Sequence, residues 1–248
     1  DGIDDIIVGA YARSSGSAYI FFGGITGTKR SETDADVILN GSGLSSFGFS
    51  VASAGDFNGD GKGDVIVGAY LADNNSEADS GSAFIFFGGI TGTKNADTDA
   101  NVILNGQDAG DNFGRYVASA GDFNGDGKGD VIVGADLDDN NGDASGSAFI
   151  FFGGITGTKN ADAADVTLEG QDAGDRFGIS VSSAGDFDGD GKEDVIVGAQ
   201  LDDNNSIDGS GSAFIFFGGI TGTKRADDDA DVILNGQSRN DFFGNSVS

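Results

Sequence analysis

Apolar residues in this chain gather in short runs of five or six positions, separated by stretches rich in glycine and aspartate. The run S-A-F-I-F-F at residues 82–87 is apolar at both odd and even positions. Alternate side chains of a strand point to opposite faces, so we expect Ala83 and Ile85 on one face and Phe84 and Phe86 on the other. Such a strand must be covered on both faces. No segment has a sustained helical apolar period, and the pattern predicts an all-β protein.

The chain repeats one unit four times. The string G-S-A-(F/Y)-I-F-F-G-G-I-T-G-T-K begins at Gly16, Gly81, Gly146 and Gly211, and the dipeptide Phe-Gly begins at Phe47, Phe113, Phe177 and Phe243. A period of about 65 residues indicates a repeat architecture in which neighbouring units bury a shared core. No linker or shift of composition separates the units, so we expect residues 1–248 to form a single domain.

Each unit is predicted to contain four short strands joined by glycine- and aspartate-rich turns. In the second unit they are expected at about residues 47–54, 65–70, 82–87 and 101–104. Four-stranded sheets packed face to face around an axis cover both faces of every strand, and this is the arrangement of a β-propeller. The predicted fold is a β-propeller of four four-stranded blades. A β-sandwich is the alternative, but it does not explain the period.

A nine-residue stretch, D-F-N-G-D-G-K-G-D, stands at residues 56–64 and recurs with small changes at 122–130 and 186–194, each time followed by V-I-V-G-A. Side chains with oxygen donors occupy positions 1, 3, 5 and 9, and glycine occupies position 6. Alternate placement lets short carboxylates converge, while the glycine permits the sharp turn. This arrangement suits a hard cation with six or more oxygen ligands, so it predicts calcium, with magnesium a poorer candidate. The alternative is an acidic turn that holds no ion.

The predicted ligands are the four side chains and the backbone carbonyl at position 7 of each loop. They are Asp56, Asn58, Asp60, Lys62 and Asp64; Asp122, Asn124, Asp126, Lys128 and Asp130; and Asp186, Asp188, Asp190, Lys192 and Asp194, with the lysines acting through their carbonyls. Residues 1–10 align with 60–69, so the chain starts inside a fourth loop that retains Asp1, Ile3 and Asp5. Because this loop lacks positions 1 and 3, we expect three calcium sites and a fourth that is weak or empty.

The two ends of the chain are expected to complete one blade. Residues 243–248 align with 47–52, the first strand of a unit, whereas the N-terminus begins at the second strand. Pairing of the strand near 243–247 with that at 5–10 would close a ring and remove exposed sheet edges. Half of an eight-bladed dimer, or part of a longer array, are the alternatives.

Composition excludes several classes of function. The formal net charge is −28, which argues against nucleic-acid binding and against docking on anionic membranes. No apolar run reaches transmembrane length, and no signal segment is present in this sequence. The chain has no cysteine, so it offers no thiol nucleophile and no zinc-thiolate site. It also has no histidine, the residue that most often acts as a general base in enzymes.

The order Phe-Gly, D-x-(N/D)-x-D-G-x-x-D and V-G-A within each unit resembles the FG-GAP repeats of integrin α-subunit propellers, and the resemblance spans the whole chain. It implies that each unit is one propeller blade and that calcium binds the loop between the first and second strands. Two departures stand out: Tyr11, Tyr70, Asp136 and Gln200 replace the proline that usually ends the GAP motif, and the family usually has seven blades.

The expected function is therefore a calcium-binding, non-enzymatic propeller, extracellular or at the cell surface, used for adhesion, ligand binding or assembly. A carbohydrate-binding lectin is the alternative, and a hydrolase with paired carboxylates is a weaker one. Three loops rich in aspartate and asparagine, at residues 71–80, 136–145 and 201–210, are expected on the face opposite the calcium loops. They are either solvated or receive a protein or glycan partner, and a homo-oligomer is a further candidate assembly.

Overall fold

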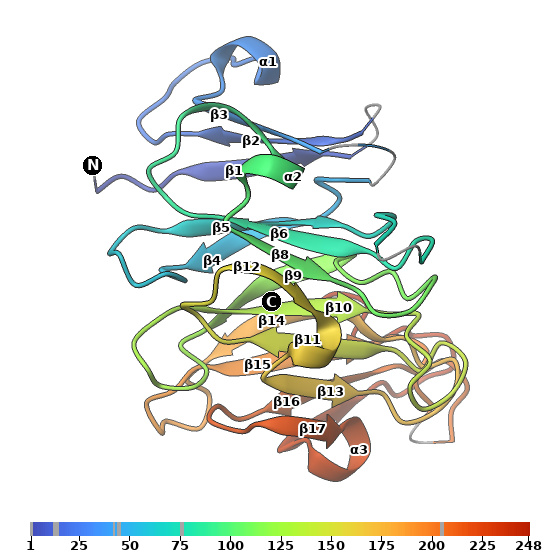
Figure 1. Ribbon diagram of the computed structural model, residues 1–248. Coiled ribbons are helices and arrows are strands. Elements are labelled where there is room, and N and C mark those ends of the chain that lie inside the picture. The colour runs from blue at the N-terminus through green and yellow to red at the C-terminus, as the bar shows by residue number, and fades with distance from the viewer. Residues whose placement is uncertain (1, 12–14, 42, 44–45, 75–76, 204–205) are drawn as a thin grey trace.

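Figure 1 shows the computed structural model, which describes residues 2–11, 15–41, 43, 46–74, 77–203 and 206–248. The described strands form four sheets, one for each unit. In spatial order the first contains β1 (Ile6–Ala10), β2 (Ser17–Phe21), β3 (Val37–Asn40) and β7 (Gly92–Asn95), and the second contains β12 (Gly157–Asn160), β8 (Val102–Asn105), β6 (Ser82–Phe86), β5 (Asp64–Ala69) and β4 (Val51–Gly55). The third contains β17 (Gly222–Arg225), β13 (Val166–Glu169), β11 (Ser147–Phe151), β10 (Asp130–Ala135) and β9 (Tyr116–Gly121), and the fourth contains β14 (Phe177–Gly185), β15 (Asp194–Ala199), β16 (Ser212–Phe216) and β18 (Val232–Asn235).

The all-β prediction is confirmed, and the strands of the second unit fall close to their predicted places. Its first strand is the exception, because it begins at Val51 rather than Phe47. Gly48 has a φ of 83°, and the amide of Phe49 donates to the carbonyl of Ser46, so a tight turn stands where the strand was expected. The described helices are single turns: α1 (Ser31–Asp34), α2 (Ala96–Asp99), η1 (Ala161–Ala163) and α3 (Ala226–Asp229). None of the helices in the described part of the chain has the length and apolar character needed to span a bilayer.

The prediction of four strands in every sheet is wrong for the second and third sheets, which have five. The additional strands β7, β12 and β17 come from the G-T-K segments that follow the third strand of units two, three and four. Each pairs in parallel with the fourth strand of the preceding unit, for example β12 with β8. Units two, three and four therefore each hydrogen-bond to the sheet before them, and this ties consecutive sheets together.

Apolar side chains fill the space between consecutive sheets, as the two-sided pattern predicted. Ala83 and Ile85 of β6 belong to the core shared with the third sheet, whereas Phe84 and Phe86 belong to the core shared with the first. A third core joins the third and fourth sheets. Burial on both faces explains why the central strand of each unit, after its first serine, is apolar on both faces.

The V-G-A motif of one unit meets the Phe-Gly motif of the next at a close backbone contact. The carbonyl oxygen of Gly68 accepts a hydrogen bond from the amide of Gly48 in its own unit. The carbonyl group of Gly114, in the next unit, lies against Gly68. A Cβ at Gly68 would overlap that carbonyl oxygen, and the same holds for Gly134 against Gly178. Glycine is therefore required at this point of each unit by the approach of two backbones.

Closure of a ring by the two chain ends stays a prediction. Among the described residues, β1 pairs with β2, and the predicted partner segment 243–247 forms no strand. Phe243 instead makes a bridge to Gly211, the same contact that Phe177 makes with Gly146 in the preceding unit. The last Phe-Gly therefore packs on the fourth unit in the way that each internal Phe-Gly packs on the unit before it.

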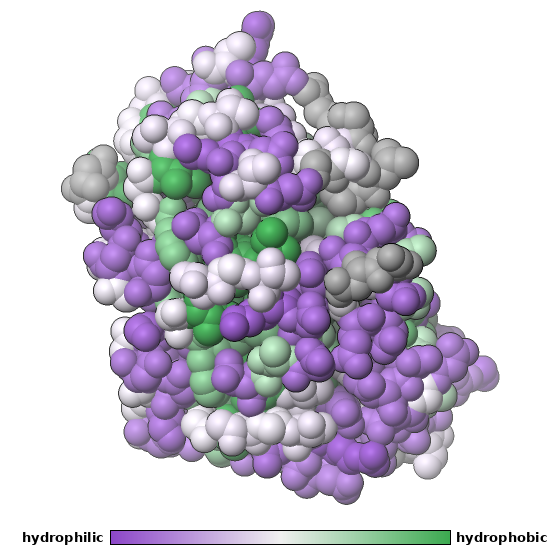
Figure 2. Space-filling model, in the orientation of Figure 1, coloured by the Kyte–Doolittle hydropathy of each residue, from purple (hydrophilic) through white to green (hydrophobic). Residues whose placement is uncertain are grey.

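The two families of loops lie at opposite ends of the sheets. The loops β4–β5, β9–β10 and β14–β15 project on one side, at the left of Figure 1, and the loops β5–β6, β10–β11 and β15–β16 project on the other. Hydrophilic side chains cover most of the surface seen in Figure 2, and hydrophobic ones show over a small central area. We call the end that carries the loops β5–β6, β10–β11 and β15–β16 the aspartate-rich end.

Candidate metal loops and the opposite end

Three loops of the same conformation join the first and second strands of units two, three and four. In the first, both carboxylate oxygens of Asp56 accept backbone amides, those of Asp60 at 2.9 Å and Gly61 at 2.8 Å. Asn58 Oδ1 accepts the amide of Asp60 at 2.8 Å, and Asp60 Oδ1 accepts that of Lys62 at 3.0 Å. Gly61 has a φ of 85°, which supplies the turn that brings these oxygens together. The side chains at positions 1, 3 and 5 therefore point into their own loop.

The other two loops repeat this geometry. The position-1 side chains of Asp122 and Asp186 each accept two loop amides, at 2.8 to 3.1 Å. In the third loop, ligand oxygens of Asp186, Asp188 and Asp194 lie within 4.8 Å of one another. Carboxylates at such separations repel one another, and a cation between them would relieve the repulsion.

The aspartates at position 9 anchor each loop to its sheet. Asp64, Asp130 and Asp194 begin β5, β10 and β15 and are almost completely buried. Asp130 accepts the amide of Gly153, after β11, at 2.8 Å and that of Asn124, in its own loop, at 3.2 Å. Burial raises the pKa of Asp130 to about 6, and the neighbouring carboxylates raise it too, against the two hydrogen bonds that lower it. Among the described residues, no cationic side chain offsets the charge of this buried carboxylate.

The lysines at position 7 keep their ammonium groups outside the loops. Lys62 Nζ lies 3.9 Å from Asp60, and Lys192 Nζ lies 3.8 Å from Asp190, in exposed pairs that contribute little to stability. Lys128 extends over Gly59 of the preceding loop. The role assigned to the three backbone carbonyls stays a prediction.

The partial fourth loop retains one anchoring contact. Asp5 Oδ1 accepts the amide of Gly23 at 2.8 Å, the counterpart of the bond between Asp130 and Gly153. Ile3 is 54% exposed, and Asp1 lies outside the described residues. The described part of this loop thus holds the position-9 anchor of a metal loop without the side chains at positions 1 and 3.

At the aspartate-rich end, the structure brings together buried carboxylates that sequence reasoning missed. Asp111 and Asp138 are each 5% exposed, and Asp175 and Asp202 repeat the pair in the next unit. Burial, followed by the charge of Asp138, raises the pKa of Asp111 to about 7, and burial and Asp202 do the same to Asp175. The repeated string Q-D-A-G-D at residues 107–111 and 171–175 was the signal that could have found them.

Replacing Asp111 with asparagine is expected to remove part of the pH dependence of folding. The folded-state pKa of about 7 lies above the ordinary value of 3.8, so the native state retains this proton while the unfolded state loses it. The free energy of unfolding of the wild type therefore falls as the pH rises from about 4 to 7. Asp111→Asn should match the wild type near pH 4 and exceed it by about 1–2 kcal/mol at pH 8, after discounting for solvent screening.

Urea unfolding at pH 4, 6 and 8 in constant calcium measures this difference. Asp162→Asn is the control, because it removes the same charge at an exposed aspartate that is not among the groups shifting the pKa of Asp111. A stability difference between Asp111→Asn and wild type that is equal at all three pH values would contradict the assignment.

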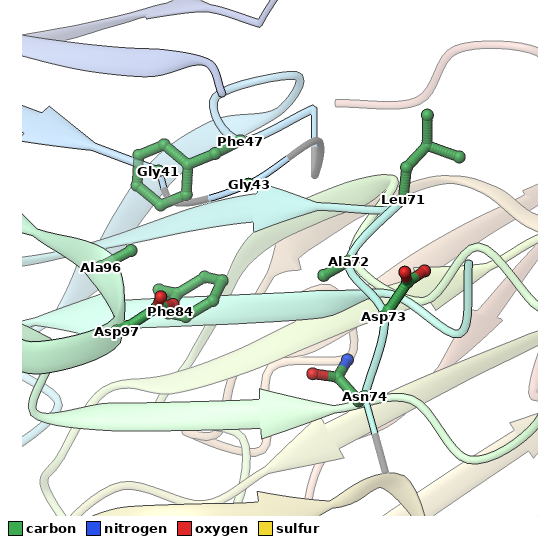
Figure 3. A pocket seen from close by; sticks show the side chains of 10 residues that line it. All are labelled: Gly41, Gly43, Phe47, Leu71, Ala72, Asp73, Asn74, Phe84, Ala96 and Asp97. Atoms are coloured by element: carbon green, nitrogen blue, oxygen red, sulfur yellow. The ribbon is translucent and has the colours of Figure 1, made fainter. Parts of the chain in front are cut away.

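A cavity of about 250 Å³ lies between the first and second units (Figure 3). The rings of Phe47 and Phe84 form part of its wall, and Asp73 and Asn74 from the loop after β5 lie on another side. Phe47 and Phe84 are 0% and 6% exposed, so neither presents an open ring face. The cavity therefore lacks the aromatic platform on which a sugar would stack.

Comparison with known proteins gives one family and a set of relatives. The FG-GAP repeat family matches residues 47–86, 114–151 and 177–216. The chain is 30% identical to integrin alpha-5 of Xenopus laevis over 210 residues, which cover 80% of this chain and 18% of that protein. It is 35% identical to integrin alpha-7 of Rattus norvegicus over 169 residues, 67% of this chain and 14% of that protein.

A third relative is a phosphatidylinositol-glycan-specific phospholipase D of Bos taurus, 30% identical over 187 residues, which cover 69% of this chain and 22% of that protein. The chain thus spans less than a quarter of the length of each of these relatives. The similarity is confined to the repeat region that each match covers.

Proposed function

Since this chain is an FG-GAP repeat protein, we propose that it is a calcium-binding, non-enzymatic β-propeller with a role in adhesion or ligand binding outside the cell. The similarity to integrin alpha subunits favours this role. The observation that carries the calcium assignment is the threefold recurrence of one loop whose inward side chains are all oxygen donors. We further propose that residues 1–248 act as one repeat domain.

The donor set fits calcium better than the other common metals. The loops offer carboxylate oxygens, joined by a side-chain amide oxygen at position 3 of the first two, and the chain has no cysteine or histidine for a softer ion. Calcium accepts six to eight oxygens in flexible geometry, whereas magnesium requires a near-ideal octahedron. A bound ion would supply positive charge beside the buried carboxylates Asp64, Asp130 and Asp194.

Two other functions have less support. A hydrolase needs a carboxylate pair free to act on a substrate, but the loop acids of this chain are engaged with backbone amides. The phospholipase match covers too little of that enzyme to carry its activity to this chain. A lectin would need exposed aromatic rings, and the rings that line the cavity of Figure 3 are buried. A glycan array and a hydrolase screen would test these two alternatives directly.

Calorimetric titration of metal-free protein with calcium tests the proposal. We expect three sites in the wild type and two in Asp126→Asn, because asparagine keeps the shape of the position-5 side chain but removes its charge. Asp108→Asn, which removes one charge outside the loops, should retain three sites. Absence of saturable binding, or an unchanged number of sites in Asp126→Asn, would show that these loops are acidic turns without an ion.

A further inference from the structure

One cluster at the aspartate-rich end draws side chains from three units and differs from everything else in the repeat. It consists of Phe49, Tyr70, Arg115, Tyr116, Asp136 and Arg176, and we call it the arginine–tyrosine cluster. The Phe49 ring lies 4.8 Å from that of Tyr70 and 6.1 Å from that of Tyr116, centroid to centroid. Tyr11 of the first unit packs edge-on against Phe49 at 5.0 Å, so all four units reach this place.

The residues of the cluster occupy positions at which otherwise matching units differ. The residue after Phe-Gly is Phe49, Arg115, Ile179 or Asn245, and the residue after V-G-A is Tyr11, Tyr70, Asp136 or Gln200. The string G-S-A-F-I-F-F, by contrast, stands unchanged in three units. Packing that all units share would favour the same residue in each, and the fourth unit folds with Ile179 and Gln200. The fold itself therefore does not require arginine, tyrosine and aspartate here.

The charges of the cluster do not balance. Arg115 Nη1 donates to both oxygens of Asp136, at 3.2 and 3.0 Å, and Arg176 Nη1 lies 3.6 Å from the same carboxylate. Asp136 is completely buried, whereas the side chains of Arg115 and Arg176 are 25% and 36% exposed. Two guanidinium groups thus share one carboxylate, which leaves a local positive charge in a chain of net charge −28.

Three aromatic rings lie close to the guanidinium group of Arg115. The Arg115 guanidinium carbon lies 6.0, 5.6 and 5.7 Å from the ring centroids of Phe49, Tyr70 and Tyr116. Arg115 Nε is buried and has no hydrogen-bond partner among the described residues. Burial raises the pKa of Tyr116, so its hydroxyl stays protonated and able to donate. Hydrogen-bond donors and apolar ring surface therefore lie side by side in this cluster. Its two arginines have one carboxylate partner in the cluster, Asp136, although each could bind a carboxylate of its own.

We propose that the arginine–tyrosine cluster is a binding site for a carboxylate group of a partner molecule. The carboxylate would take the second anionic position beside Arg176, where a planar guanidinium can bind it with two parallel hydrogen bonds. The rings would contact an apolar or aromatic group next to that carboxylate. Tyrosine and arginine are the residues that most often dominate binding energy at protein interfaces. The overall negative charge opposes approach at long range, but at physiological salt it is screened beyond about 8 Å.

Benzoate is a suitable probe, because it joins a carboxylate to an aromatic ring, and benzamide is its neutral counterpart. NMR signals of the arginine Nε–H groups report on the cluster directly in calcium-loaded protein at physiological salt. We expect saturable shifts of the Arg176 signal with benzoate, with a Kd in the millimolar range typical of so small a ligand, at about 1 mM or above. Benzamide should cause no saturable shift.

Two variants test the assignment to the cluster. Arg176→Gln should weaken benzoate binding at least about tenfold, the effect expected from losing a charge-assisted hydrogen bond. Arg239→Gln is the matched control, because Arg239 is an exposed arginine paired with Asp208 outside the cluster, and it should bind benzoate as the wild type does. If the cluster served only to hold the units together, the Arg176→Gln protein would be less thermally stable than the wild type. The wild type would then show no saturable benzoate binding.

Two tripeptides with acetylated N-termini distinguish between the possible sources of the carboxylate. One carries an aspartate side chain and an amidated C-terminus, and the other carries asparagine and a free C-terminus, each beside a phenylalanine. Binding of either peptide supports the proposal and shows which carboxylate the site accepts. Binding of benzoate alone supports a small-molecule carboxylate. Absence of benzoate binding, equal binding of benzamide, or unchanged binding in Arg176→Gln would overturn the proposal.

Discussion

Transfer of the protein from calcium to a chelator is expected to lower its thermal midpoint by tens of degrees. Each occupied loop contributes roughly 2.7 kcal/mol when free calcium is a hundredfold above its dissociation constant. Three loops together contribute roughly 8 kcal/mol, which corresponds to a fall of roughly 20 °C for a chain of this size. The physical cause is repulsion among the loop carboxylates: in the third loop, Asp186, Asp188 and Asp194 hold oxygens within 4.8 Å of one another.

Differential scanning calorimetry with and without chelator measures this effect. The Asp126→Asn variant measures the contribution of a single loop. Emptying one loop of three should lower the calcium-loaded midpoint by about a third of the full shift. Asp108→Asn, outside the loops, should melt as the wild type does in both conditions. Superimposable wild-type melting curves with and without chelator would refute a stabilising role for calcium.

Gly134→Ala is expected to destabilise the protein by about 3 kcal/mol or more. The Cβ would overlap the carbonyl oxygen of Gly178 in the next unit, and backbone atoms cannot rotate away as a side chain can. Gly134 itself does not have a left-handed conformation, so the cost arises from the contact between units. Urea unfolding in saturating calcium measures the change.

Gly63→Ala is the matched control, since an added Cβ there meets no atom within 4 Å. The fourth unit already carries Glu193 at this position of its loop. We expect its free energy of unfolding to stay within about 0.5 kcal/mol of the wild type. Equal effects of the two alanines would mean that the V-G-A glycines are not required by backbone contact.

Sequence alone determined the features that depend on neighbouring residues. Strand β6 was predicted at 82–87 and lies at Ser82–Phe86, because its two-sided apolar pattern is local and repeated. The inward turn of the three acidic loops follows from residue spacing and one glycine within nine positions. The division of β6 between two cores, with Ile85 on one side and Phe84 on the other, follows from strand geometry and the need to bury both faces.

Tertiary structure decided whatever depends on a partner distant in the chain. The G-T-K segments have no strand pattern of their own, and they become β7, β12 and β17 because the fourth strand of the preceding unit offers unpaired backbone groups. The raised pKa of Asp111 needs the burial and the facing Asp138 that only folding provides. Arg115, Asp136 and Arg176 lie 21 to 61 positions apart in the sequence and share one salt-bridge network only because three units converge. A sequence pattern records which face of a strand is buried, but it does not record which unit lies against that face.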